Sequence, residues 1–345
     1  MAYDVKDLPI IHLNLGVKKG KLGKIINVFK RCFAVAGWKK QLGIDVTYSF
    51  GPTANLVNVL SKSQGETWCG IRSYMDMNPS NNRMLKLFTS RADKIISCSR
   101  LIEEELKDKF DCKNVETLYN PYDSAWICSQ AEEKITDIPW KRKENLTLVS
   151  MGREDDVKGY WHLLKAFSFV LKGEKDAKLL IVGDGSFEEY KKLAKELGIE
   201  ENVCFTGLKK NPFPYIAEAH IYVLTSYNEG FPNALVEAMT LGVPVIATNC
   251  LTGPAEILLQ EYTGQPEIEE SIMAEYGILI PNMSPEKNLQ SSVIEDDEKK
   301  LAETILKLWN DKELYQKYVE KAKERSAYFN YETYIEQFQK MMKNV

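Results

Sequence analysis

The chain has 345 residues, which is long enough for two domains with a sizeable core in each. An apolar fraction of 44% and a charged fraction of 27% are ordinary for a soluble globular protein, and no apolar run approaches the roughly 20 residues of a membrane-spanning helix. The net charge is −4, and the polar, mixed start Met1–Leu8 excludes a signal peptide, so we expect a cytoplasmic protein with no nucleic-acid partner.

The cysteines and the charge distribution bear on the kinds of site and partner that this protein could have. Seven cysteines are scattered along the chain without a C-x-x-C pair, which favours buried free thiols over a disulfide framework or a metal site. Residues 1–145 hold 23 basic and 17 acidic residues, a balance of +6, whereas the remainder holds 22 basic and 32 acidic residues, a balance of −10. The first half is therefore suited to an anionic surface or substrate, unless the distribution is chance.

The chain begins with a predicted strand and a basic amphipathic helix. Ile10–Leu15 has strand composition, and Lys18–Gln41 has helical periodicity with many lysines. Such a helix either packs on a sheet or lies on a membrane surface, and packing is the more common use, so we favour it. The apolar face at helical spacing consists of Leu22, Ile25, Ile26, Phe29 and Phe33.

The rest of the first half alternates strands and helices, which is typical of a parallel α/β sheet. A polar, irregular segment, Tyr122–Asn145, is the best candidate for a domain boundary. The predicted elements are strands over 44–50, 67–72, 94–98 and 115–119 and helices over 53–62, 82–91 and 100–110.

The same alternation restarts at Leu146 and predicts a second doubly wound unit. We expect a first domain over 1–125, a linker over 126–145, a second domain over 146–328, and a last helix over 329–345. The predicted strands are 146–151, 178–183, 203–206, 221–224, 243–247 and 277–280, and the predicted helices are 160–171, 187–197, 213–219, 232–241, 299–309, 312–329 and 331–343.

One stretch, Glu229–Leu241, has the pattern of a ligand-binding helix start between two strands. Pro232 suits a first helical position, where its missing N–H is not needed, and Gly242 suits a helix end. Free N–H groups around Phe231–Ala234 would attract an anion, and two carboxylates, Glu229 and Glu237, could accept sugar hydroxyls. The pattern indicates a nucleotide-sugar site or, alternatively, an ordinary capped helix.

Other motifs follow predicted strands in the same half of the chain. Arg153 follows Gly152, and Lys158 precedes Gly159, so both cations are placed to meet one anion, such as a diphosphate leaving group. Gly183 and Gly185 frame a G-x-G that is equally typical of a turn, and Gly207 is similar. The segment 252–256 (TGPAE) also follows a strand and could reach the same edge.

Taken in order, these motifs resemble the carboxyl-terminal domain of glycosyltransferase family 4. The resemblance spans about Leu146–Pro281 and is carried by G-R, K-G, V-G-D-G, F-T-G, E-G-F-P-N-A-L-V-E-A-M, G-V-P-V-I-A-T and G-P-A-E-I-L. It implies an α/β fold of the GT-B type, with two doubly wound Rossmann-like domains facing across a cleft. It also implies a retaining enzyme that uses a nucleotide sugar. In such an enzyme the domain 1–125 would be the acceptor side, the domain 146–328 would bind the nucleotide sugar, and the last helix, 329–345, would return to the first domain.

The resemblance also implies roles for single residues. Glu229 and Glu237 match the family's E-x7-E motif, with Glu229 against the donor sugar and Glu237 on the ribose hydroxyls. Arg153 and Lys158 match the basic pair that neutralises the diphosphate, so no metal is expected, and no D-x-D motif is present. The other donor-binding residues are Gly152, Gly183, Gly185, Gly207 and the loop residues Gly230, Phe231, Pro232 and Asn233.

The first half departs from the family pattern. Roughly one βαβ unit is missing at its start, so we expect a shortened domain, a partner chain that covers the gap, or a rebuilt domain. Many family members carry a His near the strand end at 70–76, where this chain offers other polar residues. The segment Ser49–Pro52 follows a predicted strand and could line the acceptor side or could be a structural turn. The acceptor-side candidates are Gly51, Asn55, Arg72, Ser73 and Asp76.

These features together predict a retaining, metal-independent glycosyltransferase. It would move a hexosyl or N-acetylhexosaminyl group from a UDP-sugar, without a cofactor, to a glycan or lipid-linked acceptor in surface polysaccharide or glycolipid synthesis. The basic first half predicts loose docking on an anionic membrane. The alternatives are a non-catalytic nucleotide-binding partner subunit and a UDP-sugar epimerase, although three histidines are few for the latter.

Overall fold

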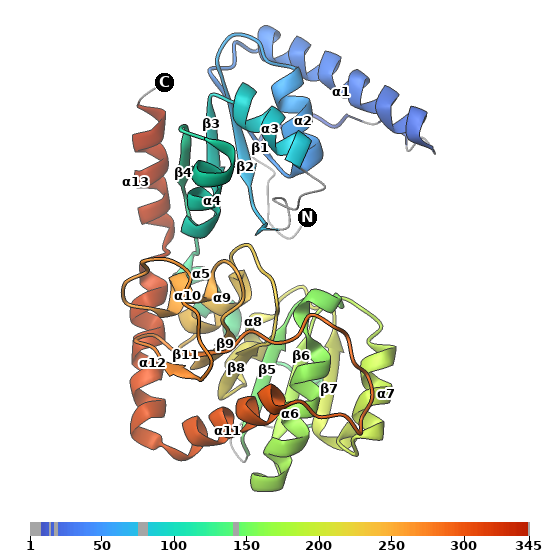
Figure 1. The fold of residues 1–345 in the computed structure, drawn as a ribbon, viewed down its shortest axis with the longest axis vertical. Helices are drawn as coiled ribbons and strands as arrows, with labels where there is room; N and C mark the ends of the chain where they lie inside the picture. Colours follow the sequence, from blue (N-terminus) through green and yellow to red (C-terminus); the bar gives the residue numbers. More distant parts are fainter. Residues whose placement is uncertain (1–7, 14, 17–19, 75–81, 141–144, 344–345) are drawn as a thin grey trace. The chain divides into compact units, whose positions relative to one another are not determined.

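The fold is described from a computed structural model, which covers residues 8–13, 15–16, 20–74, 82–140 and 145–343 (Figure 1). The chain divides into two compact units. The first unit comprises Met1–Leu118 and Phe338–Val345, and the second comprises Tyr119–Gln337. Each unit is described by itself.

The first unit has a parallel sheet of four strands, in the order β1-β2-β3-β4. A helix precedes each strand, as the alternating pattern predicts, and the buried side chains of β2 and β3 form the core with α3 and α4. β1 is an edge strand that pairs with β2 alone. The elements are α1 (Lys21–Gln41), β1 (Val46–Phe50), α2 (Pro52–Leu60), β2 (Glu66–Ile71), α3 (Asn82–Arg91), β3 (Lys94–Ser97), α4 (Arg100–Phe110) and β4 (Val115–Thr117).

The second unit has a sheet of seven strands, in the order β10-β11-β9-β8-β5-β6-β7. All neighbours are parallel except β10 and β11, so the carboxyl ends of β5, β6, β8 and β9 lie along one edge. The strands are β5 (Thr147–Met151), β6 (Lys178–Val182), β7 (Val203–Gly207), β8 (Ile221–Leu224), β9 (Val245–Thr248), β10 (Ile272–Met273) and β11 (Ile278–Ile280). The helices are α5 (Ser124–Ala131), α6 (Tyr160–Gly173), α7 (Glu188–Glu196), α8 (Phe213–Ala217), α9 (Asn233–Thr240), α10 (Pro254–Leu258), α11 (Asp296–Asn310), α12 (Lys312–Ala327) and α13 (Tyr331–Met342), the last of which continues into the first unit.

Phe338, which lies on the last helix, α13, is part of the first unit. Its ring centroid lies 5.8 Å from that of Trp68, a fully buried residue of β2, and 6.4 Å from that of Tyr48 of β1. Aromatic pairs at this separation are favourable beyond the area that they bury. The first unit is therefore built from both ends of the chain.

Three local predictions were wrong. No described residue of 10–15 is in a strand, and Ile10 and Ile11 are exposed, because no neighbouring strand pairs with them. The segment 122–145 is not irregular throughout, since it contains α5, whose cap Asp123 accepts a hydrogen bond from the Trp126 amide. The segment 258–274, in which no regular element was expected, ends in the short strand β10.

The prediction that the apolar face of the first helix packs on a sheet was also wrong. α1 instead contacts α2 through an adjacent side of the helix, where Cys32 and Lys39 are buried. The Lys39 ammonium donates to the Asn58 carbonyl at 3.2 Å and to its side-chain oxygen at 2.7 Å, which fixes this side inward. None of the helices in the described part of the chain has both the length and the apolar character to cross a bilayer.

A buried polar cluster joins α6 to α11 in the second unit. His162 Nδ1 lies 2.8 Å from Glu298 Oε1, and the Lys165 ammonium lies 3.7 Å from the same oxygen, with all three side chains fully buried. Glu298 also accepts from the Glu295 amide as part of a capping box at the start of α11. His162, Glu295 and Glu298 could together hold a metal ion, but the adjacent Lys165 ammonium already supplies the positive charge.

We predict that Glu298→Ala destabilises the protein by about 3–5 kcal/mol, because it leaves the Lys165 ammonium buried without a counter-charge. Urea-induced unfolding followed by circular dichroism measures the change. The control is Asp296→Ala in the same helix, which breaks an exposed pair with Lys299 and should cost far less stability than Glu298→Ala. Equal losses in the two variants would contradict the structural role of the cluster.

Candidate functional site

The loop that follows β5 is held against the end of β6. The Gly152 amide donates to the Val182 carbonyl at 3.0 Å, and the Glu154 amide donates to the Asp184 carbonyl at 2.7 Å. Gly183 permits this approach, because a Cβ atom there would lie 1.8 Å from the Gly152 carbonyl oxygen. The predicted G-x-G therefore has a packing role that the turn interpretation did not include.

The same loop is held on its other side by the end of β8. The Tyr227 amide donates to the Val157 carbonyl at 3.0 Å, and the Thr225 hydroxyl donates to the Lys158 carbonyl at 2.9 Å. Gly159 has a φ of 60°, and a Cβ there would lie 2.4 Å from the Thr225 carbonyl oxygen. The backbone of the loop is thus fixed at both sides, which positions the side chain of Lys158.

The structure brings Lys158 and Glu229 together. The Lys158 ammonium lies 2.7 Å from Glu229 Oε1, and both side chains are partly buried. The lysine stem passes over Gly152, where a Cβ would lie 2.8 Å from Lys158 Cε. Arg153 belongs to the same loop, is exposed, and has no ion pair with any residue that the structure describes. The site therefore offers one paired and one unpaired cation.

α9 begins beside this pair and has an open N-terminus. Its first helical residue is Asn233, one residue later than predicted, and Pro232 is the N-cap residue without a side-chain cap. No acidic residue lies in its first turn, so the helix dipole and amides favour an anion there. Gly253 braces the turn, since a Cβ there would lie 2.3 Å from Pro232 Cδ, and the Thr252 hydroxyl donates to the Glu229 carbonyl.

The side chains after Glu229 are engaged within the second unit. Gly230 is buried, and Phe231 packs its ring against Tyr119 and Phe329 at centroid separations of 5.1 and 5.3 Å. The Asn233 side-chain oxygen accepts from the Tyr122 hydroxyl at 2.7 Å. These side chains anchor the loop, and its backbone amides are the groups that remain for a ligand.

Two further donor-side glycines lie at strand ends. A Cβ at Gly185 would lie 2.3 Å from Glu154 Cβ, so this residue again serves close packing of loops. Gly207 ends β7 with a φ of 70°, in open space, and its carbonyl accepts from the Gly183 amide at 3.3 Å. Sequence reasoning missed Tyr160. Its hydroxyl donates to the Gly152 carbonyl at 2.9 Å and so helps to hold the loop after β5.

Glu237 lies in the second turn of α9, eight residues after Glu229. Burial raises the pKa of the Glu237 carboxyl to about 7 from its ordinary value of 4.5. A carboxylate in a poorly hydrated place is costly for the fold, and a ligand hydroxyl would lower this cost by hydrogen bonding. This environment is what a ligand-binding carboxylate needs.

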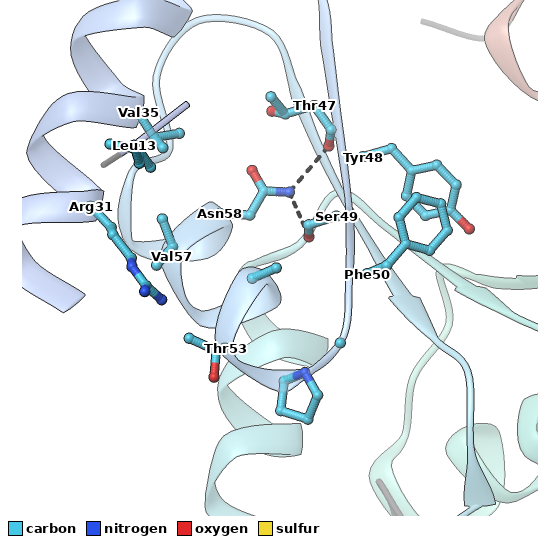
Figure 2. Close-up of a pocket in the computed structure, with 13 residues that line it drawn as sticks. Leu13, Arg31, Val35, Thr47, Tyr48, Ser49, Phe50, Thr53, Val57 and Asn58 are labelled. Carbon is cyan, nitrogen blue, oxygen red and sulfur yellow. Dashed lines mark hydrogen bonds between the residues drawn. The ribbon is translucent and has the colours of Figure 1, made fainter. Parts of the chain in front are cut away.

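The acceptor-side candidates belong to the first unit, which has a pocket of about 810 Å³ beside β1 (Figure 2). Gly51 lines it, whereas Asn55 is buried, accepts from the Ser49 hydroxyl at 2.8 Å and donates to the Gly70 carbonyl at 2.9 Å. Arg72 lies over the Phe50 ring, 5.8 Å from its centroid. Ser73 follows β2 in the same part of the unit, and Asp76 lies outside the described residues.

Known proteins match this chain. Residues 131–271 match the family described as glycosyl transferases group 1. An uncharacterized glycosyltransferase of Methanocaldococcus jannaschii is 34% identical over 200 residues, which cover 57% of this chain and 49% of that protein, so the chain spans about half the length of this relative. The N-acetylgalactosamine-N,N'-diacetylbacillosaminyl-diphospho-undecaprenol 4-alpha-N-acetylgalactosaminyltransferase of Campylobacter jejuni is 26% identical over 347 residues, covering 96% of this chain and 85% of that protein. Other relatives are named for amylovoran and lipopolysaccharide sugar transfer.

Solved structures match the fold. The crystal structure of Anabaena HepE in complex with UDP superposes with a TM-score of 0.73 at 18% identity, covering 95% of this chain and 85% of that chain. A likeness at this identity concerns the fold alone. The predicted fold class is confirmed, because both units are α/β with parallel Rossmann-like sheets and the structural neighbours have the GT-B fold.

We predict that Glu237→Gln stabilises the protein above pH 7 and leaves its stability unchanged below pH 4.5. A folded-state pKa raised to about 7 means that stability is full while the carboxyl is protonated and is lost as the pH rises from 4.5 through 7. Removing the charge should therefore add about 1–3 kcal/mol at pH 8. Thermal unfolding at pH 4.5, 6 and 8 measures it.

The control for this prediction is Glu275→Gln. Glu275 is an exposed carboxylate whose pKa is lowered by its hydrogen bond to Lys321, so its charge helps the fold and the sign is reversed. This variant should lose a little stability or none at pH 8. A Glu237→Gln protein that unfolds at the wild-type temperature at every pH would show that the carboxylate is well solvated.

Proposed function

Because residues 131–271 match the group 1 glycosyl transferases and the fold is of the GT-B class, we propose that this chain is a retaining glycosyltransferase. It transfers a hexosyl or N-acetylhexosaminyl group from a UDP-sugar to a glycan or lipid-linked acceptor. The observation that carries the proposal is the contact between Lys158 and Glu229 beside the uncapped start of α9.

The charges at this edge suit a sugar diphosphate. Lys158, Arg153 and the α9 amides supply positive charge for the phosphates, and Glu229 supplies an acceptor for the sugar hydroxyls. In the absence of donor, Lys158 and Glu229 neutralise each other. When a diphosphate arrives, the ammonium gains a second anionic partner and the carboxylate turns to the sugar. With these cations in place, the proposed reaction needs no metal ion.

The transfer step balances without a protein nucleophile. The acceptor hydroxyl oxygen forms a bond to the anomeric carbon on the face from which the diphosphate leaves, while the bond from that carbon to the β-phosphate oxygen breaks. The acceptor proton passes to the departing phosphate oxygen. Lys158 and Arg153 stabilise the negative charge that grows on the diphosphate, which is the largest contribution that such a site can make.

The identity of donor and acceptor is supported by the matched proteins. HepE was crystallised with UDP, and the Campylobacter jejuni relative is named for an undecaprenol-linked acceptor. We propose UDP as the carrier for this chain too, with Glu237 on the ribose, and a role in surface polysaccharide or glycolipid synthesis. The pocket beside β1, lined by Phe50, Gly51 and Pro52, is the proposed acceptor side.

We predict that UDP binds the wild-type protein and binds Lys158→Ala at least tenfold more weakly, because one charge-assisted hydrogen bond is worth about 1.5–3 kcal/mol. Isothermal titration calorimetry measures both. Lys192→Ala is the matched control, since this lysine is 79% exposed in the same unit. No heat of UDP binding at millimolar concentration would refute the donor assignment.

We predict that Glu229→Gln retains the fold and UDP affinity within a few-fold but loses at least 100-fold in sugar transfer, because the lost charge orients the sugar in the transition state. A screen of UDP-sugars for donor hydrolysis, then for transfer, measures it, and NMR gives the product anomer. EDTA should leave the rate unchanged. An inverted linkage would refute retention, and UDP binding without hydrolysis or transfer would indicate a nucleotide-binding partner subunit.

A further inference from the structure

The helix α1 exposes a continuous apolar stripe on the first unit. Leu22 and Phe33 are 78% and 79% exposed, and Phe29 between them is 58% exposed. Ile25 and Ile26 are also exposed and complete the stripe. At 100° per residue these five side chains fall within about a third of the helix circumference. An exposed stripe of this size marks a surface that another body covers.

A different side of α1, adjacent to this stripe, holds the helix to its unit. Cys32 is buried against α2, with its thiol directed to the Val57 carbonyl at 4.0 Å. The buried Lys39 ammonium is satisfied by Asn58, and the Asn27 side chain donates to the Gly16 carbonyl at 3.0 Å. The exposed stripe is therefore presented by an anchored helix.

The charges on α1 indicate which kind of surface could cover the stripe. The sequence of the helix contains no Asp or Glu, and its exposed charged residues include Lys24, Lys30 and Lys40. Lys30 borders the stripe, and Lys40 continues it at the last turn. A second copy of this chain would bring two such cationic faces together, which is unfavourable. An anionic surface complements them.

We propose that α1 docks the protein on an anionic lipid bilayer, with the apolar stripe at the level of the acyl boundary and the lysines among the headgroups. A helix with an apolar stripe and cationic residues beside it is the form that lies in a membrane interface. The inference is independent of the proposed transfer chemistry, because it rests on the surface of the first unit alone.

Co-sedimentation of the full chain with vesicles tests this inference. We expect binding to vesicles that contain phosphatidylglycerol, much weaker binding to pure phosphatidylcholine, and a decrease with added salt. The double variant Phe29→Ser, Phe33→Ser should lower the partition coefficient at least tenfold. Lys30→Gln and Lys40→Gln should each lower it about fivefold.

The controls use exposed residues of the second unit. Leu208→Ser, at a 72% exposed position, and Lys192→Gln should leave vesicle binding unchanged. Circular dichroism and UDP titration of each variant show whether fold and donor site persist. Equal binding to neutral and anionic vesicles, or equal binding by the α1 variants, would overturn the inference. So would light scattering that shows a dimer which the α1 variants dissociate, because a second copy would then be the occupant.

Discussion

The parallel sheet of the second unit brings Lys158 and Glu229 together, and the candidate site is built around their ion pair. The two residues are 71 positions apart in the chain, yet their side chains meet at 2.7 Å because β5 and β8 are neighbours that end at the same edge. A parallel sheet with all its connections on the faces leaves this edge free of crossing chain, so loops can meet there. The backbone hydrogen bonds from Gly152 and Tyr227 then fix the loop that carries the lysine.

Two of the lysine–glutamate pairs in the second unit have different consequences. Lys165 and Glu298 are fully buried between two helices, where separation of the charges is costly and the pair can only hold the elements together. Lys158 and Glu229 remain partly exposed at a sheet edge, where water or a ligand can compete for each charge. The Lys165–Glu298 pair is therefore structural, whereas the charges of Lys158 and Glu229 remain available to a ligand.

The sequence predicts the alternation of strands and helices and the placing of Arg153 and Lys158 after β5, because hydrophobic period and glycine positions are local signals. It does not predict which side chains near Glu229 face a ligand. Phe231 matches a binding motif, but its ring packs against the ring of Tyr119, a residue more than a hundred positions earlier in the chain. Likewise, the apolar stripe of α1 was evident as a pattern, whereas its exposure depends on the polar contact that fixes the adjacent side of the helix. Contacts of this kind are set by tertiary packing and leave no local trace.

The place of Phe338 in the first unit has a consequence for biosynthesis. Tyr48 and Trp68 are synthesised before the second unit, whereas the Phe338 ring that packs on them is synthesised after it. Every strand of the second unit, from β5 to β11, precedes that ring in the chain, so the sheet can form before the ring is available. The contacts of Phe338 with Tyr48 and Trp68 can form only afterwards. The order of synthesis therefore lets the inserted second unit fold before the first unit gains these contacts.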